Sequence, residues 1–310
     1  MALQISFSVL ALTFLLGVAS ATDALSAIEF SYSGNNGPAK WGNLDPTFSA
    51  CSSGKKQSPI NIQKNQTVPN RSLKPLDRNY KPANATLVNN GFNVGLRFEE
   101  YAGELSIDGK NYLLKQMHWH LPSEHRIDGQ QYALLSLRNL MYWNQSNQFQ
   151  TLVRSICFEL YFNLLRPGKL NRFAAELHLV HRAEDNSLAV VAILYLEDDA
   201  DPFISKLKDG LDKLAKEHCK ADEIAEIPIG TMDPKQLKRS SRKYYRYVGS
   251  LTTPPCSESV TWSILGKVRS ISKEQIAALQ TPVKSDCKKN ARPCQAMNGR
   301  KVELYNELFE

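Results

Sequence analysis

The fold of this chain is constrained most by a series of short segments that are rich in β-branched and aromatic residues. Each segment is bounded by Gly, Asn, Asp or Pro, the residues that form turns between strands. The segments that fit this description best are 86–99, 104–120, 176–181, 188–196 and 258–265. The sequence therefore predicts a protein built mostly from β-strands.

Helical patterns occur at two places. In residues 201–218, apolar side chains recur at three- and four-residue steps. These side chains are Phe203, Ile204, Leu207, Leu211 and Leu214. A second helix is expected to begin at Ser272, whose partner Gln275 completes a capping box. The chain has 310 residues, 42% of them hydrophobic, which is enough for a substantial core. We expect a single, mainly β domain with peripheral helices.

The N-terminus has the composition of a signal peptide. Residues 1–21 are uncharged and apolar and end in Ala-Ser-Ala, but they are too short to span a bilayer comfortably. We predict cleavage after Ala21, a mature domain over 22–310 without a membrane anchor, and secretion, with vacuole or plastid as further destinations. Six cysteines fit an exported, disulfide-bonded chain. Four N-x-S/T sequons are candidates for glycosylation: Asn65, Asn70, Asn84 and Asn144.

The net charge of +7 is compatible with binding nucleic acid or an acidic surface. The densest basic run is KQLKRSSRKYYR, residues 235–246, in which tyrosines and charges alternate as on a half-exposed strand. A solvated strand face explains this run better than a nucleic-acid site. We therefore expect no nucleic-acid partner, and the sequence leaves the oligomeric state open.

The stretch QMHWHLPSEH, residues 116–125, contains three of the six histidines in the chain. On a strand, His118 and His120 face the same side, with their backbones about 7 Å apart. In ELHLVH, His178 shares a face with Glu176. If the two strands are neighbours, the three histidines can bind one zinc ion and leave the fourth position open for water.

Each histidine cluster also supplies a hydrogen-bond acceptor on the same face. Gln116 and Glu176 stand two residues before His118 and His178, where they can accept the remaining ring N–H of a metal-bound imidazole. The alternative is that these are scattered strand histidines satisfied by ordinary hydrogen bonds. That alternative does not account for three histidines and two acceptors in one pattern, so we predict a metal site.

Several motifs together resemble the α-type carbonic anhydrases, in particular the secreted plant branch that includes the dioscorins and nectarins. The motifs are GPAKW, QSPINI, QMHWH followed by SEH, ELHLVH, and GSLTTPPCSESVTW. The resemblance runs from about Phe30 to Tyr305. It implies one domain on a large, mostly antiparallel, twisted central sheet of about ten strands, with zinc at the base of a conical cleft.

The resemblance also implies an activity, the reversible hydration of CO₂ to bicarbonate and a proton, with zinc-bound hydroxide as the nucleophile. In the family pattern, Thr252 accepts the hydroxide proton and donates its own proton to Glu124, and Thr253 lies beside it at the substrate site. The residues that match the apolar wall for CO₂ are Val180, Val190, Leu251, Val260 and Trp262.

One part of the family pattern is missing. Fast members carry a histidine just after an Asn-Gly pair, and this histidine moves the product proton to buffer. Here the stretch reads NNGFNV, and Phe92 stands in that place. We therefore expect hydration to be limited by proton transfer.

About forty residues, 134–174, interrupt the family pattern before ELHLVH, in what should be a continuous strand. A functional insertion, such as a lid or an oligomerisation element, is one explanation. A retained intron is the preferred one, because insertions are accepted at turns more readily than in a strand that carries a metal ligand. If the segment is translated, the strand near Glu176 and the binding of zinc are at risk.

The resemblance also bears on the cysteines. Cys51 and Cys256 match the pair that forms a disulfide in secreted members, which implies a bond between the N-terminal region and the loop that carries Thr252. The remaining cysteines have no assigned partners: Cys157, Cys219, Cys287 and Cys294. A bond between the last two is one option.

Two classes of function follow from the resemblance. The first is a working zinc lyase, and the second is a storage or defence protein of dioscorin type with weak or no catalysis. Proteins that have lost the chemistry often lose a zinc histidine, whereas this chain keeps all three, together with Glu124 and Thr252. The enzyme is therefore the preferred interpretation. A basic carbohydrate- or nucleic-acid-binding module is supported by net charge alone.

Overall fold

The computed structural model describes residues 29–129, 173–217, 224–237 and 242–309. The predicted signal peptide, the Asn144 sequon, Cys157 and Cys219 lie outside the described residues, as does the predicted insert apart from its last two positions. Within the described ranges, no helix has the length and apolar character needed to cross a membrane.

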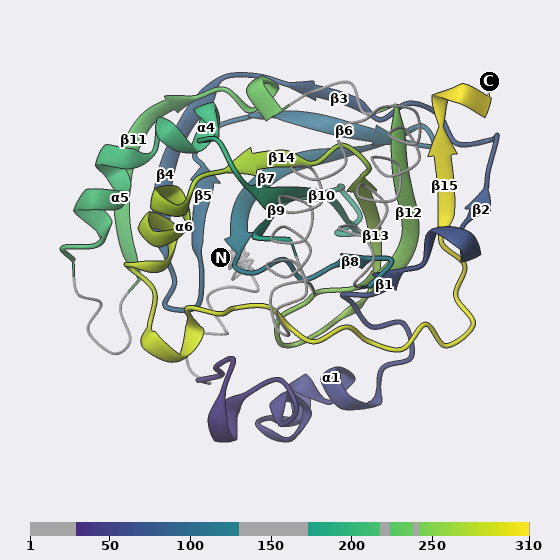
Figure 1. The fold of residues 1–310 in the computed structure, drawn as a ribbon, viewed down its shortest axis with the longest axis horizontal. Helices are drawn as coiled ribbons and strands as arrows, with labels where there is room; N and C mark the ends of the chain where they lie inside the picture. Colours follow the sequence, from purple (N-terminus) through teal and green to yellow (C-terminus); the bar gives the residue numbers. More distant parts are fainter. Residues whose placement is uncertain (1–28, 130–172, 218–223, 238–241, 310) are drawn as a thin grey trace, which may run out of the picture.

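The described residues form fifteen strands (Figure 1). In chain order they are β1 (Asn61–Ile62), β2 (Val68–Pro69), β3 (Asp77–Tyr80), β4 (Ala83–Asn89), β5 (Val94–Phe98), β6 (Gly103–Ile107), β7 (Lys110–His120), β8 (Arg126–Ile127), β9 (Ala175–Arg182), β10 (Leu188–Glu197), β11 (Ala225–Met232), β12 (Lys243–Ser250), β13 (Glu258–Leu265), β14 (Arg269–Ile271) and β15 (Glu303–Asn306).

Thirteen of these strands form one sheet, whose main path runs β11-β4-β5-β7-β9-β10-β13-β12-β15-β2. Strands β3, β6 and β14 pair beside this path, and β1 and β8 form a separate two-stranded sheet. Most neighbours are antiparallel, but β10 is parallel to β13 and β14, β15 to β2, and β1 to β8. The prediction of a mainly β, single-domain fold on a large sheet is confirmed, and the sheet is mixed and larger than the ten strands expected.

The helices are short and peripheral, as predicted (Figure 1). They are α1 (Ala50–Ser53), α4 (Pro202–Ser205), α5 (Lys208–Leu214) and α6 (Lys273–Gln280). The capping box of Ser272 and Gln275 at the start of α6 is present. The single helix expected over 201–218 is wrong, because α4 and α5 are separate. The N–H groups of Lys206 and Leu207 bond to carbonyls three residues back, and this tighter turn separates the two helices.

Side chains alternate across the central strands as their sequence predicts. Met117 and Trp119 of β7 and Leu177 and Leu179 of β9 are buried in the larger hydrophobic cluster. The histidines at the positions between them therefore face the other side of the sheet. His181 lies on the face away from those histidines, where it bonds to the Tyr80 hydroxyl over 2.9 Å.

The expectation of a half-exposed strand at 235–246 is wrong for its tyrosines. Tyr244 and Tyr245 point to opposite faces of β12, yet each is only 1% exposed. Tyr244 stacks on Tyr305 of β15, with ring centres 5.0 Å apart, and Tyr245 packs in the smaller hydrophobic cluster. Within this run, strand β12 begins only at Lys243, and Pro234–Leu237 form a 3₁₀ helix, so the run identified neither the start of the strand nor the exposure of its tyrosines.

The strand that carries His178 is intact, although the insert precedes it. Strand β9 begins at Ala175 and pairs with both β7 and β10. Phe173 and Ala174, at the end of the predicted insert, already contact the fold, since their N–H groups bond to Ser123 Oγ and Tyr195 O. Before the gap, the described chain ends in a turn with positive φ at Asp128 and Gly129. The described part of the strand is therefore continuous through Glu176, where a translated insert was expected to put it at risk.

Candidate metal centre

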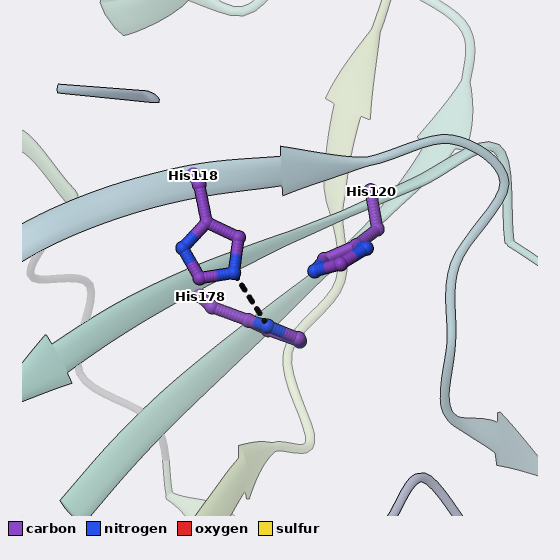
Figure 2. A group of neighbouring side chains, drawn as sticks. All are labelled: His118, His120 and His178. Carbon is purple, nitrogen blue, oxygen red and sulfur yellow. Dashed lines mark hydrogen bonds between the residues drawn. The ribbon is translucent and has the colours of Figure 1, made fainter. Parts of the chain in front are cut away.

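Three imidazoles converge where β7 and β9 run side by side. His118 and His178 are direct partners in the antiparallel register, and His120 pairs with Glu176 two residues further on. One ring nitrogen from each histidine lies within 4.8 Å of those of the other two. Figure 2 shows the three rings turned toward a common point, with His178 Nδ1 and His118 Nε2 only 3.3 Å apart. The structure thus brings together the predicted ligand set.

The other nitrogen of each ring is held by an acceptor. His118 Nδ1 donates to Gln116 Oε1 over 2.8 Å, and His178 Nε2 donates to Glu176 Oε1 over 2.9 Å. Gln116 and Glu176 are the two acceptors predicted from the alternation of side chains along the strands. His120 Nδ1 instead donates to the main-chain carbonyl of residue 290 over 2.6 Å. Each ring is therefore fixed in one orientation, with its second nitrogen facing the centre.

The electrostatics of the three rings suit a cation. Burial lowers the pKa of His118 well below its usual value, lowers that of His120 to about 4, and lowers that of His178. All three are therefore neutral at pH 7. His120 Nε2 is buried and has no hydrogen-bond partner among the described residues, which is costly unless another group occupies the site. Three neutral imidazole nitrogens with fixed second partners are the donor set that zinc takes in catalytic sites.

A buried hydrogen-bond chain continues behind Glu176. Glu176 Oε1 also accepts from His125 Nδ1 over 2.6 Å, and His125 Nε2 lies 2.7 Å from the Tyr247 hydroxyl, which meets Ser58 Oγ at 2.7 Å. Burial acts to raise the pKa of Glu176, but His125 and His178 together hold it well below its usual value. The carboxylate is therefore ionised and can orient His178.

Glu124 lies next to the three rings and is completely buried. Its Oε1 accepts the N–H of Arg292 over 2.9 Å, and its Oε2 is 3.5 Å from His120 Nε2. Burial raises the pKa of Glu124 to about 7, against the lowering effects of His178 and the Thr252 side chain. A divalent cation held by the imidazoles would lower this pKa, because it adds positive charge beside the carboxylate.

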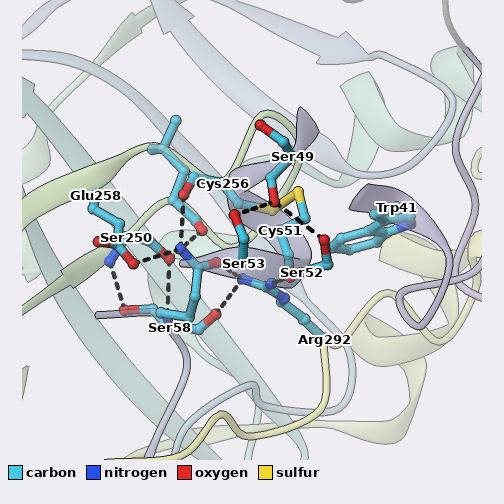
Figure 3. The surroundings of a disulfide bond; sticks show 12 residues. Trp41, Ser49, Cys51, Ser52, Ser53, Ser58, Ser250, Cys256, Glu258 and Arg292 are labelled. Carbon is cyan, nitrogen blue, oxygen red and sulfur yellow. Dashed lines mark hydrogen bonds between the residues drawn. A yellow bond between two sulfur atoms is a disulfide. The ribbon is translucent and has the colours of Figure 1, made fainter. Parts of the chain in front are cut away.

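Thr252 lies in the loop that follows β12, residues 251–257, called here the threonine loop. Thr252 is buried, and Thr253 beside it is partly exposed. The predicted disulfide between Cys51 and Cys256 is present and ties this loop to α1 (Figure 3). Within the described residues Cys287 is a buried free thiol, so its optional bond to Cys294 is not formed.

The predicted CO₂ wall forms a continuous apolar surface beside the imidazoles. Val190 pairs with Val180 across β9 and with Trp262 across β13. The Trp262 ring lies 4.9 Å from that of His178. The full set belongs to one hydrophobic cluster, either buried in it or packed against it: Val180, Val190, Leu251, Val260 and Trp262.

The side chain of Phe92, predicted in place of a proton-shuttling histidine, is partly buried and packs against apolar residues. Its ring lies 4.8 Å from that of Phe30 and packs against the cluster that contains Trp41. Its carbonyl accepts from the side chain of Asn290 over 2.9 Å. The side chain at this position therefore offers no group that can carry a proton.

Sequence reasoning missed three residues at this centre. His125 belongs to the SEH motif, in which only Glu124 was predicted to have a role. Asn290 and Arg292 act through main-chain atoms and lie about 170 residues from their partners. No pattern of side chains reports such contacts, because any residue carries the same N–H and C=O.

Comparisons with known proteins agree with this geometry. A family model for eukaryotic-type carbonic anhydrase matches residues 36–154 and 169–306. The chain is 39% identical to alpha carbonic anhydrase 7 of Arabidopsis thaliana over 282 residues, 90% of this chain and 86% of that protein. It is 36% identical to dioscorin DB3S of Dioscorea polystachya, over 90% of this chain and 88% of that protein.

A solved structure gives the same result for the fold. Dioscorin complexed with ascorbate superposes with a TM-score of 0.73 at 35% sequence identity, covering 91% of this chain and 100% of the dioscorin chain. The family model alone accounts for well over half of the sequence. The chain therefore belongs to the eukaryotic-type carbonic anhydrase family.

Proposed function

We propose that this chain catalyses the reversible hydration of CO₂ to bicarbonate, with one zinc ion bound by His118, His120 and His178. The observation that carries the proposal is the convergence of three neutral imidazoles within 4.8 Å of one another. Glu124 and the apolar wall at Trp262 lie directly beside them. When bound there, zinc would supply a water molecule acidified to a pKa of about 7.

The residues around the centre would orient this nucleophile. Glu124, held by the Arg292 N–H, accepts a hydrogen bond from the Thr252 hydroxyl. The Thr252 oxygen can then only accept a hydrogen bond, so it directs the lone pair of an attacking O–H group toward the substrate. Val190 and Trp262 exclude water from the place where an uncharged, apolar substrate lies.

The proposal is tested by metal analysis of the purified protein together with CO₂ hydration assays, with and without a primary sulfonamide. We expect one zinc per chain and hydration that the sulfonamide abolishes. A metal-free protein without inhibitable activity would favour the second candidate, a storage or defence role. That candidate is supported by the 36% identity to dioscorin DB3S.

We also propose that proton transfer limits turnover, because the side chain at position 92 is Phe and packs on Phe30. Added imidazole buffer is expected to increase kcat for hydration several-fold, and Phe92→His is expected to increase it at low buffer concentration by about tenfold or more. The conservative variant Phe92→Leu is the control and should leave the buffer dependence unchanged. High turnover that is indifferent to buffer concentration would contradict this proposal.

We further propose that the chain is secreted and that Asn65 carries an N-linked glycan. Asn65 is exposed in a short 3₁₀ turn, Lys64–Gln66. By contrast, Asn70 Nδ2 donates to Glu303, and the Asn84 side chain bonds to two other side chains. In secreted protein, we expect glycosidase treatment in heavy-oxygen water to label Asn65. Asn65→Gln should remove this glycan, whereas Thr67→Ser keeps the sequon and should retain it. An unmodified Asn65 in the exported protein would contradict the proposal.

A further inference from the structure

Arg292 connects the Glu124 carboxylate to the N-terminal part of the chain. Its main-chain N–H donates to Glu124 Oε1 over 2.9 Å. Its side chain is only 1% exposed and reaches the segment 51–58, defined here as the N-terminal segment. One residue therefore contacts the candidate centre with its backbone and a distant part of the fold with its side chain.

Both terminal nitrogens of the guanidinium donate to acceptors of the N-terminal segment. One terminal nitrogen donates to Gln57 Oε1 and to Ser58 O, both at 2.8 Å, and the other donates to Cys51 O at 2.9 Å. The guanidinium carbon lies 5.6 Å from the centre of the Trp41 ring. All these partners are neutral. Burying a cation without an ion pair costs stability. The contact therefore fixes the position of Arg292 more than it stabilises the fold.

The N-terminal segment also holds the threonine loop (Figure 3). Cys51 is joined to Cys256 by the disulfide, and Gln57 Nε2 donates to Cys256 O over 3.0 Å. Ser58 and Ser250 exchange hydrogen bonds, each N–H donating to the hydroxyl of the other at 2.8 and 3.0 Å. The N-terminal segment therefore contacts both groups that are proposed to orient the nucleophile. It contacts the threonine loop, which carries Thr252, directly, and it contacts Glu124 through Arg292.

We infer that Arg292 is a positioning residue for the Glu124–Thr252 pair: its guanidinium, fixed by the N-terminal segment, holds its own main-chain N–H against Glu124. This inference rests on the proposed CO₂ hydration. Without the guanidinium, the main chain at 292 shifts, Glu124 no longer accepts the Thr252 proton, and the Thr252 hydroxyl becomes free to donate. The Arg292 side chain itself bonds to none of the three histidines, and the His120 acceptor is the carbonyl of residue 290.

The test compares Arg292→Met with wild type in the zinc-loaded protein. A displacement of about 1 Å at a catalytic contact can cost a hundredfold, so we expect kcat/KM for CO₂ hydration to fall about tenfold to a hundredfold while zinc content stays at the wild-type level. Inhibitor binding gives a second readout. A sulfonamide bound to the zinc would donate its N–H to the Thr252 oxygen, so its affinity should fall. Azide has no N–H to donate, so its affinity should rise when the hydroxyl can donate.

Arg269→Met is the matched control, because Arg269 is a buried arginine whose side chain bonds to Asp201 and to the carbonyl of Gln236 and not to the N-terminal segment. It should lower stability without changing the ratio of the two inhibitor affinities. If Arg292→Met does not fold, Arg292→Lys keeps a cation but has a single terminal nitrogen, so it loses part of the contacts to Gln57, Ser58 and Cys51 and should shift the same ratio in the same direction. Unchanged kcat/KM and an unchanged ratio in active protein would overturn the inference. An inactive, zinc-free wild type would instead overturn the proposed function.

Discussion

Replacing His178 with alanine is expected to leave the protein without bound zinc and to reduce CO₂ hydration by at least about a thousandfold. His178 is one of three imidazoles whose nitrogens meet within 4.8 Å, and a site with two remaining nitrogens lacks the three protein ligands of a catalytic zinc centre. Because the proposed chemistry depends on that ion, the loss should approach a large part of the total acceleration. Zinc content by mass spectrometry and stopped-flow hydration measure the two effects.

His181→Ala provides the matched control. It lies on the same strand, but its ring faces away from the centre and bonds to the Tyr80 hydroxyl. This variant should lose stability, because a buried hydroxyl is left without its partner, yet it should keep zinc and activity per folded molecule. If His178→Ala retained stoichiometric zinc and wild-type hydration, the assignment of the ligands would be wrong.

Removing the disulfide, by the double change Cys51→Ser and Cys256→Ser, is expected to lower the free energy of unfolding by about 5 kcal/mol. The two cysteines are 205 residues apart, and in the chain-entropy model a bond that closes so long a loop restricts the unfolded chain strongly. The bond also joins the N-terminal segment to the threonine loop, so activity should fall together with stability.

Urea unfolding followed by fluorescence measures this change, with the slope of the transition fitted separately for each protein, because the unfolded chain without the disulfide exposes more surface. Cys287→Ser is the control, since Cys287 is a buried thiol that takes no part in this bond. It should cost less than the double change. A double variant within about 1 kcal/mol of wild type would show that the disulfide does not stabilise the fold as argued.

Local periodicity accounts for what could be predicted from the sequence. A strand repeats every two residues, so the positions of Gln116, His118 and His120 on one face follow directly from their spacing. The same reasoning placed Glu176 beside His178. Both acceptor contacts are present in the structure, because a separation of two residues on a strand leaves little freedom for the side chains.

Long-range and main-chain contacts account for what could not be predicted. The carbonyl that holds His120 and the N–H that holds Glu124 belong to residues 290 and 292, and no local pattern relates them to β7. The same limit explains Tyr244 of β12, which stacks on Tyr305 of β15 from the far end of the chain. The break between α4 and α5 depends on turn geometry that apolar spacing does not encode.

The most direct test of the account is X-ray absorption at the zinc edge on the purified, full-length protein, together with its metal content. The account predicts one zinc per chain, bound by three imidazole nitrogens at about 2.0–2.1 Å and by one further oxygen, and the loss of this signal in His178→Ala. A protein that purifies without zinc and does not take it up, or a zinc bound through sulfur, would contradict the claim that His118, His120 and His178 form the metal centre.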